Sequence, residues 1–287
     1  MRLAPLLLAL ATGWLPAQER DPPVLTPYRH FLDALDKSSL HALGKGLDRF
    51  LEMTPGLPPA RVDSLAQTYM TFFYATISLH NDRMWEDLPF LERLHADDDR
   101  QDASLQPFYA GLEKNGLDLY TFGRLYYIDQ QPDFLYRRLG GRVSPAVYSF
   151  LALRMGELAA GFSDQDSLVI SFAQVAQRVI DWEQHLVNYP RSVVERWARF
   201  YYRTYLSTLL TGLRLSPVFD ADGQLQPALV ILYDDFSKRH SRTVSGMLVR
   251  QFYDSLIEGD FHWSTAVRDF YVAHGITNMH TAQVPYR

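Results

Sequence analysis

The stretch "WEQHLVNYPRSVVERWARFYY", residues 182–202, decides the fold class of this chain. Apolar residues before and within its first half recur at the three- and four-residue steps of one helix face: Phe172, Val175, Val179, Trp182 and Leu186. Tyr189-Pro190 ends that segment, because proline disfavours helical backbone in the residue before it. The pattern predicts a helix that stops at residue 189.

A second helix is predicted immediately after the corner. Ser192, followed by Glu195 three positions later, has the spacing of a capping box. One face then continues through Val194, Trp197, Tyr201, Tyr205 and Thr208. Glu195 and Arg199 are spaced for a surface ion pair. The whole stretch therefore predicts two antiparallel helices.

The same design recurs in "YDDFSKRHSRTVSGMLVRQFY", residues 233–253. Tyr233 lies 51 positions after Trp182, and at this offset Thr243 takes the place of Ser192. A third copy fits more loosely across "TPGLPP", residues 54–59, which cannot be helical throughout. Helical spacing flanks that loop at Leu40, Leu43, Leu47 and Phe50, and at Val62, Leu65, Tyr69, Phe73 and Ile77. Repeats of such length indicate stacked supersecondary units.

The middle of the chain is less uniform. "HADDDRQDAS", residues 95–104, is an acidic loop, and β-favouring residues around Phe122-Gly123-Arg124 predict a small β-hairpin at 118–128. Helix starts are expected at the X-Pro pairs Thr26-Pro27, Gln131-Pro132 and Ser144-Pro145. "GFSDQDS", residues 161–167, ends the helix that Ser144 opens.

The helix, Tyr-Pro-x-Ser corner and aromatic helix resemble the tetratricopeptide-like hairpins of exported bacterial envelope proteins, over residues 170–260. With Trp182 as the first signature aromatic, Tyr189, Ala198 and Tyr202 match the expected aromatic, alanine and aromatic. Leu186 departs from the small residue of that pattern, Tyr205 departs from its alanine, and the copies are spaced more widely than 34 residues. The resemblance implies a scaffold that binds proteins or peptides, and it carries over no catalytic residue.

The amino terminus has the pattern of a secretory signal peptide. A basic start, the apolar run "LAPLLLALATGWL" and a small-residue cleavage point after Ala17 support this reading over a membrane anchor, since the run is too short to span a bilayer. We therefore expect a signal peptide at 1–17, a flexible lead-in at 18–26, one helical repeat domain at 27–275 and a tail at 276–287. The mature chain is expected to be soluble and extracytoplasmic, either periplasmic or secreted, with no transmembrane segment.

Composition excludes several functional classes. The 287-residue chain is 47% hydrophobic with a formal charge of -5, and no Lys/Arg-rich run could neutralise a string of phosphates, so nucleic acid is not an expected partner. Cysteine is absent, which excludes disulfides, thiolate metal sites and a cysteine nucleophile. Acidic stretches such as "DADGQLQPALVI", residues 220–231, lack EF-hand spacing and are read as turns. No cofactor, metal or catalytic motif is assigned.

Aromatic and acidic residues of the two hairpins form the candidate groove: Trp182, Glu183, Trp197, Tyr201, Tyr202, Tyr205, Tyr233, Asp234 and Tyr253. Helical spacing also explains most of these aromatics as core, and the acids as solvated helix faces. Because Tyr201 and Tyr202 are adjacent, both cannot face one seam, so one of them is expected to line a groove.

The predicted fold is all-α, with antiparallel helical hairpins stacked as a short tetratricopeptide-like solenoid and one β-hairpin insert. The predicted function is non-catalytic binding of a peptide or protein partner in the cell envelope. The alternative is a glycan-binding protein or glycoside hydrolase that uses groove aromatics, with Glu183 and Asp234 as acid and base.

Overall fold

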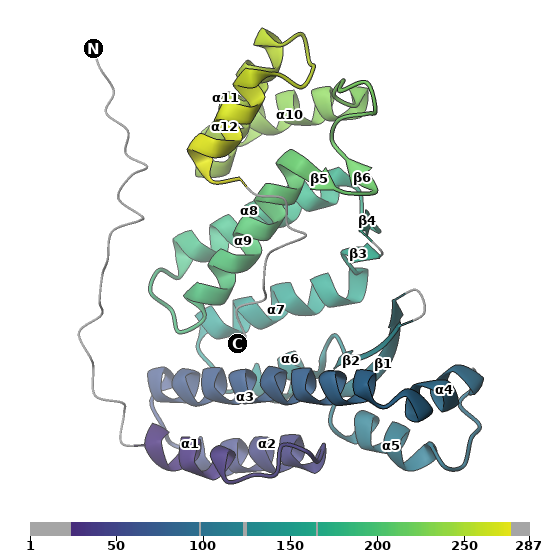
Figure 1. Ribbon diagram of the computed structural model, residues 1–287. Coiled ribbons are helices and arrows are strands. Elements are labelled where there is room, and N and C mark those ends of the chain that lie inside the picture. The colour runs from purple at the N-terminus through teal and green to yellow at the C-terminus, as the bar shows by residue number, and fades with distance from the viewer. Residues whose placement is uncertain (1–23, 98, 123–124, 165, 277–287) are drawn as a thin grey trace.

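A computed structural model of the protein describes residues 24–97, 99–122, 125–164 and 166–276 (Figure 1). These residues form twelve helices and three two-stranded antiparallel pairs, which confirms the prediction of a mainly helical chain. The predicted signal peptide, most of the lead-in and most of the tail lie outside the described residues. None of the described helices is long and apolar enough to cross a membrane.

The amino-terminal layer contains α1 (Leu25–Asp33), α2 (His41–Met53) and α3 (Pro59–Glu86). The predicted hairpin across residues 54–59 is confirmed, with α2 packed on α3. The predicted cap at Thr26 is wrong, because the N-cap is Val24, two residues earlier, and α1 begins at Leu25. Pro27 is tolerated inside the first turn, where its missing N–H has no partner in any helix, and Leu25 is buried in the core.

Next come α4 (Leu88–Ala96), α5 (Gln106–Lys114), β1 (Leu117–Phe122) and β2 (Leu125–Gln130). The predicted β-hairpin is therefore confirmed, with its turn outside the described residues. Side chains of α3 hold the outer edge of β2: Asn81 exchanges two hydrogen bonds with the backbone of Ile128, and Trp85 Nε1 donates to the carbonyl of Tyr126 at 2.7 Å. These hydrogen bonds fix the β2 edge of the hairpin on α3.

The chain continues through α6 (Phe134–Leu139) and α7 (Pro145–Ala160), and the predicted start at Ser144-Pro145 is confirmed. The cap comes from α3, where the buried Asp63 accepts a hydrogen bond from the amide of Ser144 at 2.8 Å. The helix start predicted at Gln131-Pro132 is placed too early, since α6 begins at Phe134 with Asp133 as its N-cap. After α7, two short strands, β3 (Ser163–Asp164) and β4 (Ser167–Leu168), occupy the predicted helix end.

The opening stretch forms α8 (Phe172–Asn188) and α9 (Glu195–Thr211), an antiparallel pair with its corner at Tyr189-Pro190 as predicted. The predicted capping box at Ser192 is wrong. Val194 is the N-cap, and the Ser192 hydroxyl is buried without a hydrogen-bond partner among the described residues. The reason is burial: Val194 is fully enclosed, and residues 192–195 turn to place it there before the helix begins.

The second copy of the repeat is α10 (Pro227–Arg239) and α11 (Val244–Glu258), which follow β5 (Gly212–Leu213) and β6 (Ser216–Pro217) and precede α12 (Thr265–His274). At the corner between α10 and α11, Thr243 is the N-cap of α11, and its side chain accepts a hydrogen bond from the amide of Gly246. Trp182 and Tyr233, the residues matched by the 51-residue offset, are both fully buried. The two segments are thus structurally similar hairpins.

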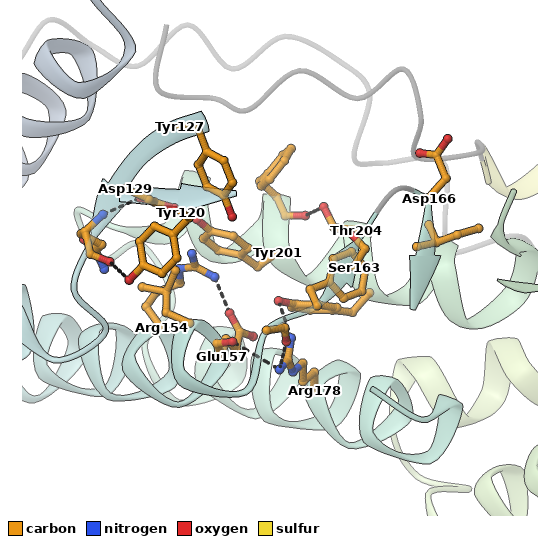
Figure 2. Close-up of a pocket in the computed structure, with 17 residues that line it drawn as sticks. Tyr120, Tyr127, Asp129, Arg154, Glu157, Ser163, Asp166, Arg178, Tyr201 and Thr204 are labelled. Carbon is orange, nitrogen blue, oxygen red and sulfur yellow. Dashed lines mark hydrogen bonds and ion pairs between the residues drawn. The ribbon is translucent and has the colours of Figure 1, made fainter. Parts of the chain in front are cut away.

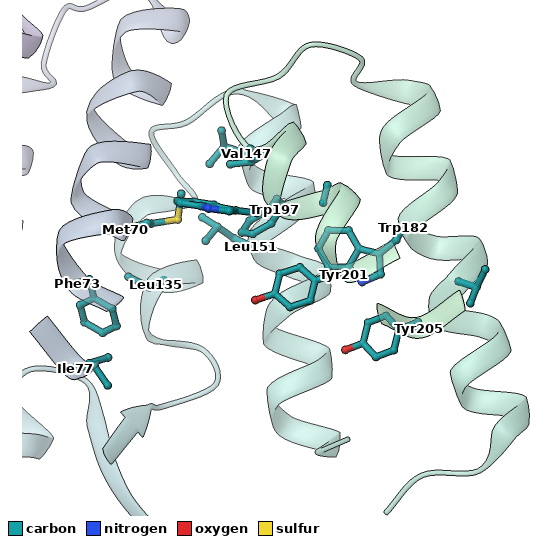
Figure 3. Packing of buried hydrophobic residues seen from close by; sticks show 14 of the residues in the cluster. Met70, Phe73, Ile77, Leu135, Val147, Leu151, Trp182, Trp197, Tyr201 and Tyr205 are labelled. Carbon is teal, nitrogen blue, oxygen red and sulfur yellow. The ribbon is translucent and has the colours of Figure 1, made fainter. Parts of the chain in front are cut away.

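Figure 1 shows the helices in successive layers, from α1 and α2 through α3 and α7 to α8 and α9, with α10, α11 and α12 at the far end. Buried hydrophobic residues from Leu25 to Phe270 form one cluster. Figure 3 shows how layers meet, with Met70 of α3 near Trp197 of α9 and Leu151 of α7. Gln67 of α3 also donates a hydrogen bond to the carbonyl of Val193 at 2.8 Å. These contacts pack α3, which also holds the β-hairpin, against α7 and α9.

Candidate functional site

A groove with two adjacent lobes that share lining residues lies between the β-hairpin, α3, α7 and α9. The lobes have volumes of about 640 and 840 Å³. Residues that line both lobes mark the junction between them: Tyr127, Asp129, Gln130, Arg154, Leu158, Phe200 and Tyr201. The first lobe continues towards α8 and β3, and the second continues along α3 towards Trp85. We call this space the hairpin groove.

The β-hairpin supplies one wall of the groove through the alternation of its side chains. Leu119 and Ile128 are paired across the strands and buried against the core, whereas Tyr120 and Tyr127 are paired on the opposite face. The rings of Tyr120 and Tyr127 are stacked with their centroids 5.6 Å apart. Asp129 follows Tyr127 on the same face, two residues along β2. This face places two tyrosines and a carboxyl group towards the groove.

The opposite wall comes from α7 and α9 and is locked by ion pairing (Figure 2). Arg154 lies 2.6 Å from the carboxylate of Glu157 and 4.0 Å above the ring of Tyr201. The other carboxylate oxygen of Glu157 accepts a hydrogen bond from Trp182 Nε1 in α8. Glu157 is buried, and both of its oxygens have partners. Glu157 therefore joins α7 to α8, and Arg154 joins α7 to α9 through the ring of Tyr201.

Arg178 and Tyr205 close the inner end of the first lobe. The buried Arg178 guanidinium donates to the carbonyl of Gly161 at 2.7 Å and to the Tyr205 hydroxyl at 3.2 Å. Burial, and secondarily the charge of Glu157, raises the pKa of Tyr205 above its ordinary value. Tyr205 is therefore a neutral hydrogen-bonding group at any physiological pH.

Asp129 differs from the other acids of the groove. Its Oδ1 accepts a hydrogen bond from the amide of Gln130 at 2.7 Å, and among the described residues no hydrogen-bond partner of Oδ2 is found. Burial raises the pKa of Asp129 although that hydrogen bond and the positive charge of Arg154 both oppose the shift. The same carboxyl group contributes to raised pKa values at Tyr120 and Tyr127, where burial is the larger cause. Asp129 is thus poorly solvated and able to accept a hydrogen bond from a ligand.

The lining of the groove is acidic overall. Four acids line it, Asp82, Asp129, Glu157 and Asp166, against the two bases Arg154 and Arg178. Glu157 is paired with Arg154, and Asp166 lies 2.9 Å from Arg214 outside the lining. Among the described residues, no ion-pair contact is found for Asp82 or Asp129. The excess negative charge therefore lies on the hairpin and on α3.

The sequence candidates separate into two sets. Tyr201 and Tyr205 line the hairpin groove, as the argument from adjacent tyrosines allowed. Trp182, Trp197 and Tyr233 lie in the core. The two remaining tyrosines lie towards the carboxyl-terminal helices, where Tyr202 is within hydrogen-bond distance of Ser245 and Tyr253 packs against Phe261. The structure therefore does not gather the nine candidates on one surface.

The two candidate acids have different roles. Glu183 is buried and accepts hydrogen bonds from the amides of Val244 and Ser245, at 2.6 and 3.1 Å, at the start of α11. Asp234 instead pairs with the exposed Lys238 one turn further along α10. Neither acid is among the described residues that line the hairpin groove. Glu183 ties the two repeats together by capping a helix, and Asp234 forms a surface ion pair.

Other polar clusters are structural. Asp97 accepts hydrogen bonds from the amides of Gln101 and Asp102, and Asp220 bonds similarly to its own turn, as the turn interpretation predicted. Across the described ranges, no three His, Asp or Glu side chains converge to hold a metal ion. The Ser149 hydroxyl lies 3.1 Å from His185 Nδ1. His185 is enclosed by aromatic rings, and burial lowers its pKa to about 4.

Sequence reasoning missed Tyr127, Asp129, Arg154 and Glu157. A usable signal was present in the hairpin, where "LDLYTF" and "LYYIDQ" alternate apolar with aromatic or acidic residues. No comparable signal marks Arg154, because its place in the groove depends on where β2 lies relative to α7 in the folded chain. Comparison of the chain with family models, with curated proteins and with solved structures finds no match.

Proposed function

We propose that this protein is a non-catalytic binding protein that holds an extended peptide segment of a partner in the hairpin groove. Its helical hairpins are proposed to stack as a short tetratricopeptide-like solenoid, with the β-hairpin as an insert that forms one wall of the binding site. The single observation that carries the proposal is the set of residues shared by the two lobes, because Tyr127, Phe200 and Asp129 line both of them.

The size and lining of the groove favour an extended ligand. Two lobes of about 640 and 840 Å³ that share a junction offer more room than one drug-sized molecule requires. Aromatic side chains provide large contact areas, and buried polar groups fix the orientation of a bound chain. Part-exposed rings at Tyr74, Tyr120 and Tyr127 provide the first kind of contact, and Asp129 provides the second.

Export to the cell envelope belongs to the same proposal. Residues 1–17 have the basic start, apolar centre and small-residue cleavage point of a signal peptide. The absence of cysteine suits a chain that folds without disulfides after export. We expect the mature protein to begin at Gln18, which amino-terminal sequencing of protein recovered from the envelope or medium would test. An intact Met1 on that material would contradict export by cleavage.

A glycan is the second candidate ligand, favoured by the stacked rings of Tyr120 and Tyr127. Flat aromatic faces of this kind suit sugar rings as well as peptide side chains. Catalysis on a glycan by Glu183 and Asp234 has no support from their positions, because the first caps α11 and the second pairs with Lys238. The glycan candidate is therefore kept as a binding function.

The test is a selection of random nonapeptides displayed on phage against the full chain, followed by titration of the selected peptides by calorimetry. We expect selection to succeed, and Tyr127→Ala to weaken binding at least tenfold, because stacking on this ring is lost. Tyr202→Ala is the matched control, since Tyr202 contacts Ser245 away from the groove, and it should bind like the wild type. Failure of the selection, together with binding to a glycan array, would replace the peptide by the glycan.

A further inference from the structure

We infer that the junction of the hairpin groove is a subsite for a basic side chain, so that the bound segment carries a lysine or arginine at the position that meets Asp129. This inference rests on the proposed peptide-binding function and adds the chemistry of the ligand. It is carried by the position of Asp129, by the acidic balance of the lining and by the aromatic residues at the junction.

The position of Asp129 comes first. Asp129 lines both lobes, so a chain that runs through the groove passes this carboxyl group. One of its oxygens is held by the amide of Gln130, which fixes the orientation of the group. Within the described residues the second oxygen has no hydrogen-bond partner, so it is available to a donor on the ligand.

Charge decides which donor fits. The positive charge of Arg154 is compensated by Glu157 at 2.6 Å, and that guanidinium is further covered by the ring of Tyr201. Asp166 is paired with Arg214 outside the lining, so the remaining acids are Asp129 at the junction and Asp82 on the side of the second lobe. Against them stands the base Arg178 in the first lobe, which leaves a net negative charge. A cationic group at the junction would restore balance, and an anionic group would be repelled.

The aromatic residues select a long basic side chain over a free ion. Tyr127 and Phe200 line both lobes beside Asp129, and Tyr120 stacks behind Tyr127. Lysine and arginine place their methylene stems along apolar surfaces while the charged head reaches a polar partner. A cation near the face of a tyrosine is also attracted by the ring. One side chain can therefore use the rings and the carboxyl group together.

The inference is tested with the same phage library of random nonapeptides, selected in parallel on the wild type and on Asp129→Asn. Asparagine keeps the shape of the side chain and the hydrogen bond to Gln130, and removes the charge. We expect wild-type selections to be enriched at least fivefold in Lys or Arg at one aligned position. Selections on Asp129→Asn should still recover aromatic peptides and lose this enrichment. Asp235→Asn, a matched charge change on the exposed face of α10, should behave like the wild type.

The outcomes separate this inference from the proposed function. Peptides that bind without basic enrichment, or enrichment that persists in Asp129→Asn, overturn the basic subsite and leave peptide binding standing. Recovery of no peptide overturns both. A second measurement changes the peptide and leaves the protein as the wild type. Replacing the enriched lysine of a selected peptide by norleucine, or an enriched arginine by alanine, should weaken its binding to the wild type at least tenfold. Unchanged affinity for the substituted peptide also overturns the inference.

Discussion

Buried tyrosines of the scaffold and Tyr127 of the hairpin groove differ in where their hydroxyl groups go. In the scaffold, Tyr233 donates to the carbonyl of Leu209 at 2.7 Å and Tyr28 donates to that of Gly46 at 2.9 Å, and both side chains are fully buried. In the groove, Tyr127 is part-exposed and has no hydrogen-bond partner among the described residues. Aromatic content alone therefore does not separate scaffold from groove, whereas exposure of the ring and the lack of a described hydroxyl partner distinguish Tyr127.

Tryptophan gives the largest expected contrast between the two regions. Trp182→Ala should lower the free energy of unfolding by about 3–5 kcal/mol, because it removes a fully enclosed ring and the donor to Glu157. Trp85→Ala, at a ring that is 44% exposed beside the groove, should cost about 1 kcal/mol. Urea unfolding followed by circular dichroism measures both. Equal costs would mean that α8 is no more central to the fold than the groove rim.

The matched acids of the repeat give the next contrast. Glu183→Ala should cost about 2–3 kcal/mol, because two buried amides at the start of α11 lose their acceptor. Asp234→Ala removes a solvent-exposed ion pair and should cost less than about 1 kcal/mol. Thermal unfolding of the two variants at one pH is sufficient to compare them. A larger loss in Asp234→Ala would contradict the structural role of Glu183.

Removal of a single hydroxyl tests the tyrosine comparison itself. Tyr233→Phe should lower the free energy of unfolding by about 0.5–1.5 kcal/mol, since the carbonyl of Leu209 loses its donor in the core. Tyr127→Phe should leave stability unchanged within error, because its hydroxyl has no described partner to lose. The chevron plots of both variants against the wild type give these values. A stability loss in Tyr127→Phe would show that its hydroxyl is part of the scaffold.

The smallest effect is expected at Asp129 and depends on pH. Burial raises its pKa in the folded state, so the folded protein holds this proton more tightly than the unfolded chain. The contribution of Asp129 to stability therefore falls as pH rises from the unfolded value of about 3.9 through the raised folded value. Asp129→Asn should raise the melting temperature by about 1–3 °C at pH 7.

The same variant should match the wild type at pH 3, where the carboxyl group is protonated in both states. The titratable neighbours are Arg154 on α7, the hydroxyls of Tyr120 and Tyr127, and Asp118, which lies opposite Asp129 in the strand register and is paired with Arg100. The arginine and the two tyrosines stay in one protonation state over this range. Stabilisation that persists at pH 3 would attribute the effect to packing. Destabilisation at pH 7 would indicate that the Asp129 charge is well solvated.

The helices of the scaffold were predictable because their signals are local. The period of Val175, Val179 and Trp182 and the proline at 190 correctly placed α8 and its end. The N-caps of the helices were less predictable. The capping box predicted at Ser192 fails because Val194 is buried and becomes the N-cap of α9. At the start of α11, Glu183 from another helix accepts a backbone hydrogen bond. A carboxylate that caps a distant helix leaves no spacing rule in the sequence.

The binding site was predictable only in part. Tyr201 and Tyr205 were named as aromatic residues of a candidate groove, although helical spacing also explained them as core, and both line the hairpin groove. Asp129 was not named, because an acid in a short strand is also typical of a solvated edge. Its partly buried position follows from the packing of β2 against α3 and from the walls of the groove across from it, which no local pattern encodes. The groove depends on tertiary contacts, whereas the helical hairpins follow from the periodic spacing of apolar residues in the sequence.

Amide hydrogen–deuterium exchange of the full chain, with and without a selected peptide, tests the central claim most directly. We expect slower exchange on binding in residues 117–122, 125–130, 154–162 and 200–205, which lie in the walls of the hairpin groove, and unchanged exchange in residues 233–258. Protection confined to residues 233–258, with the β-hairpin unaffected, would place the ligand on the aromatic helices of the scaffold and contradict it.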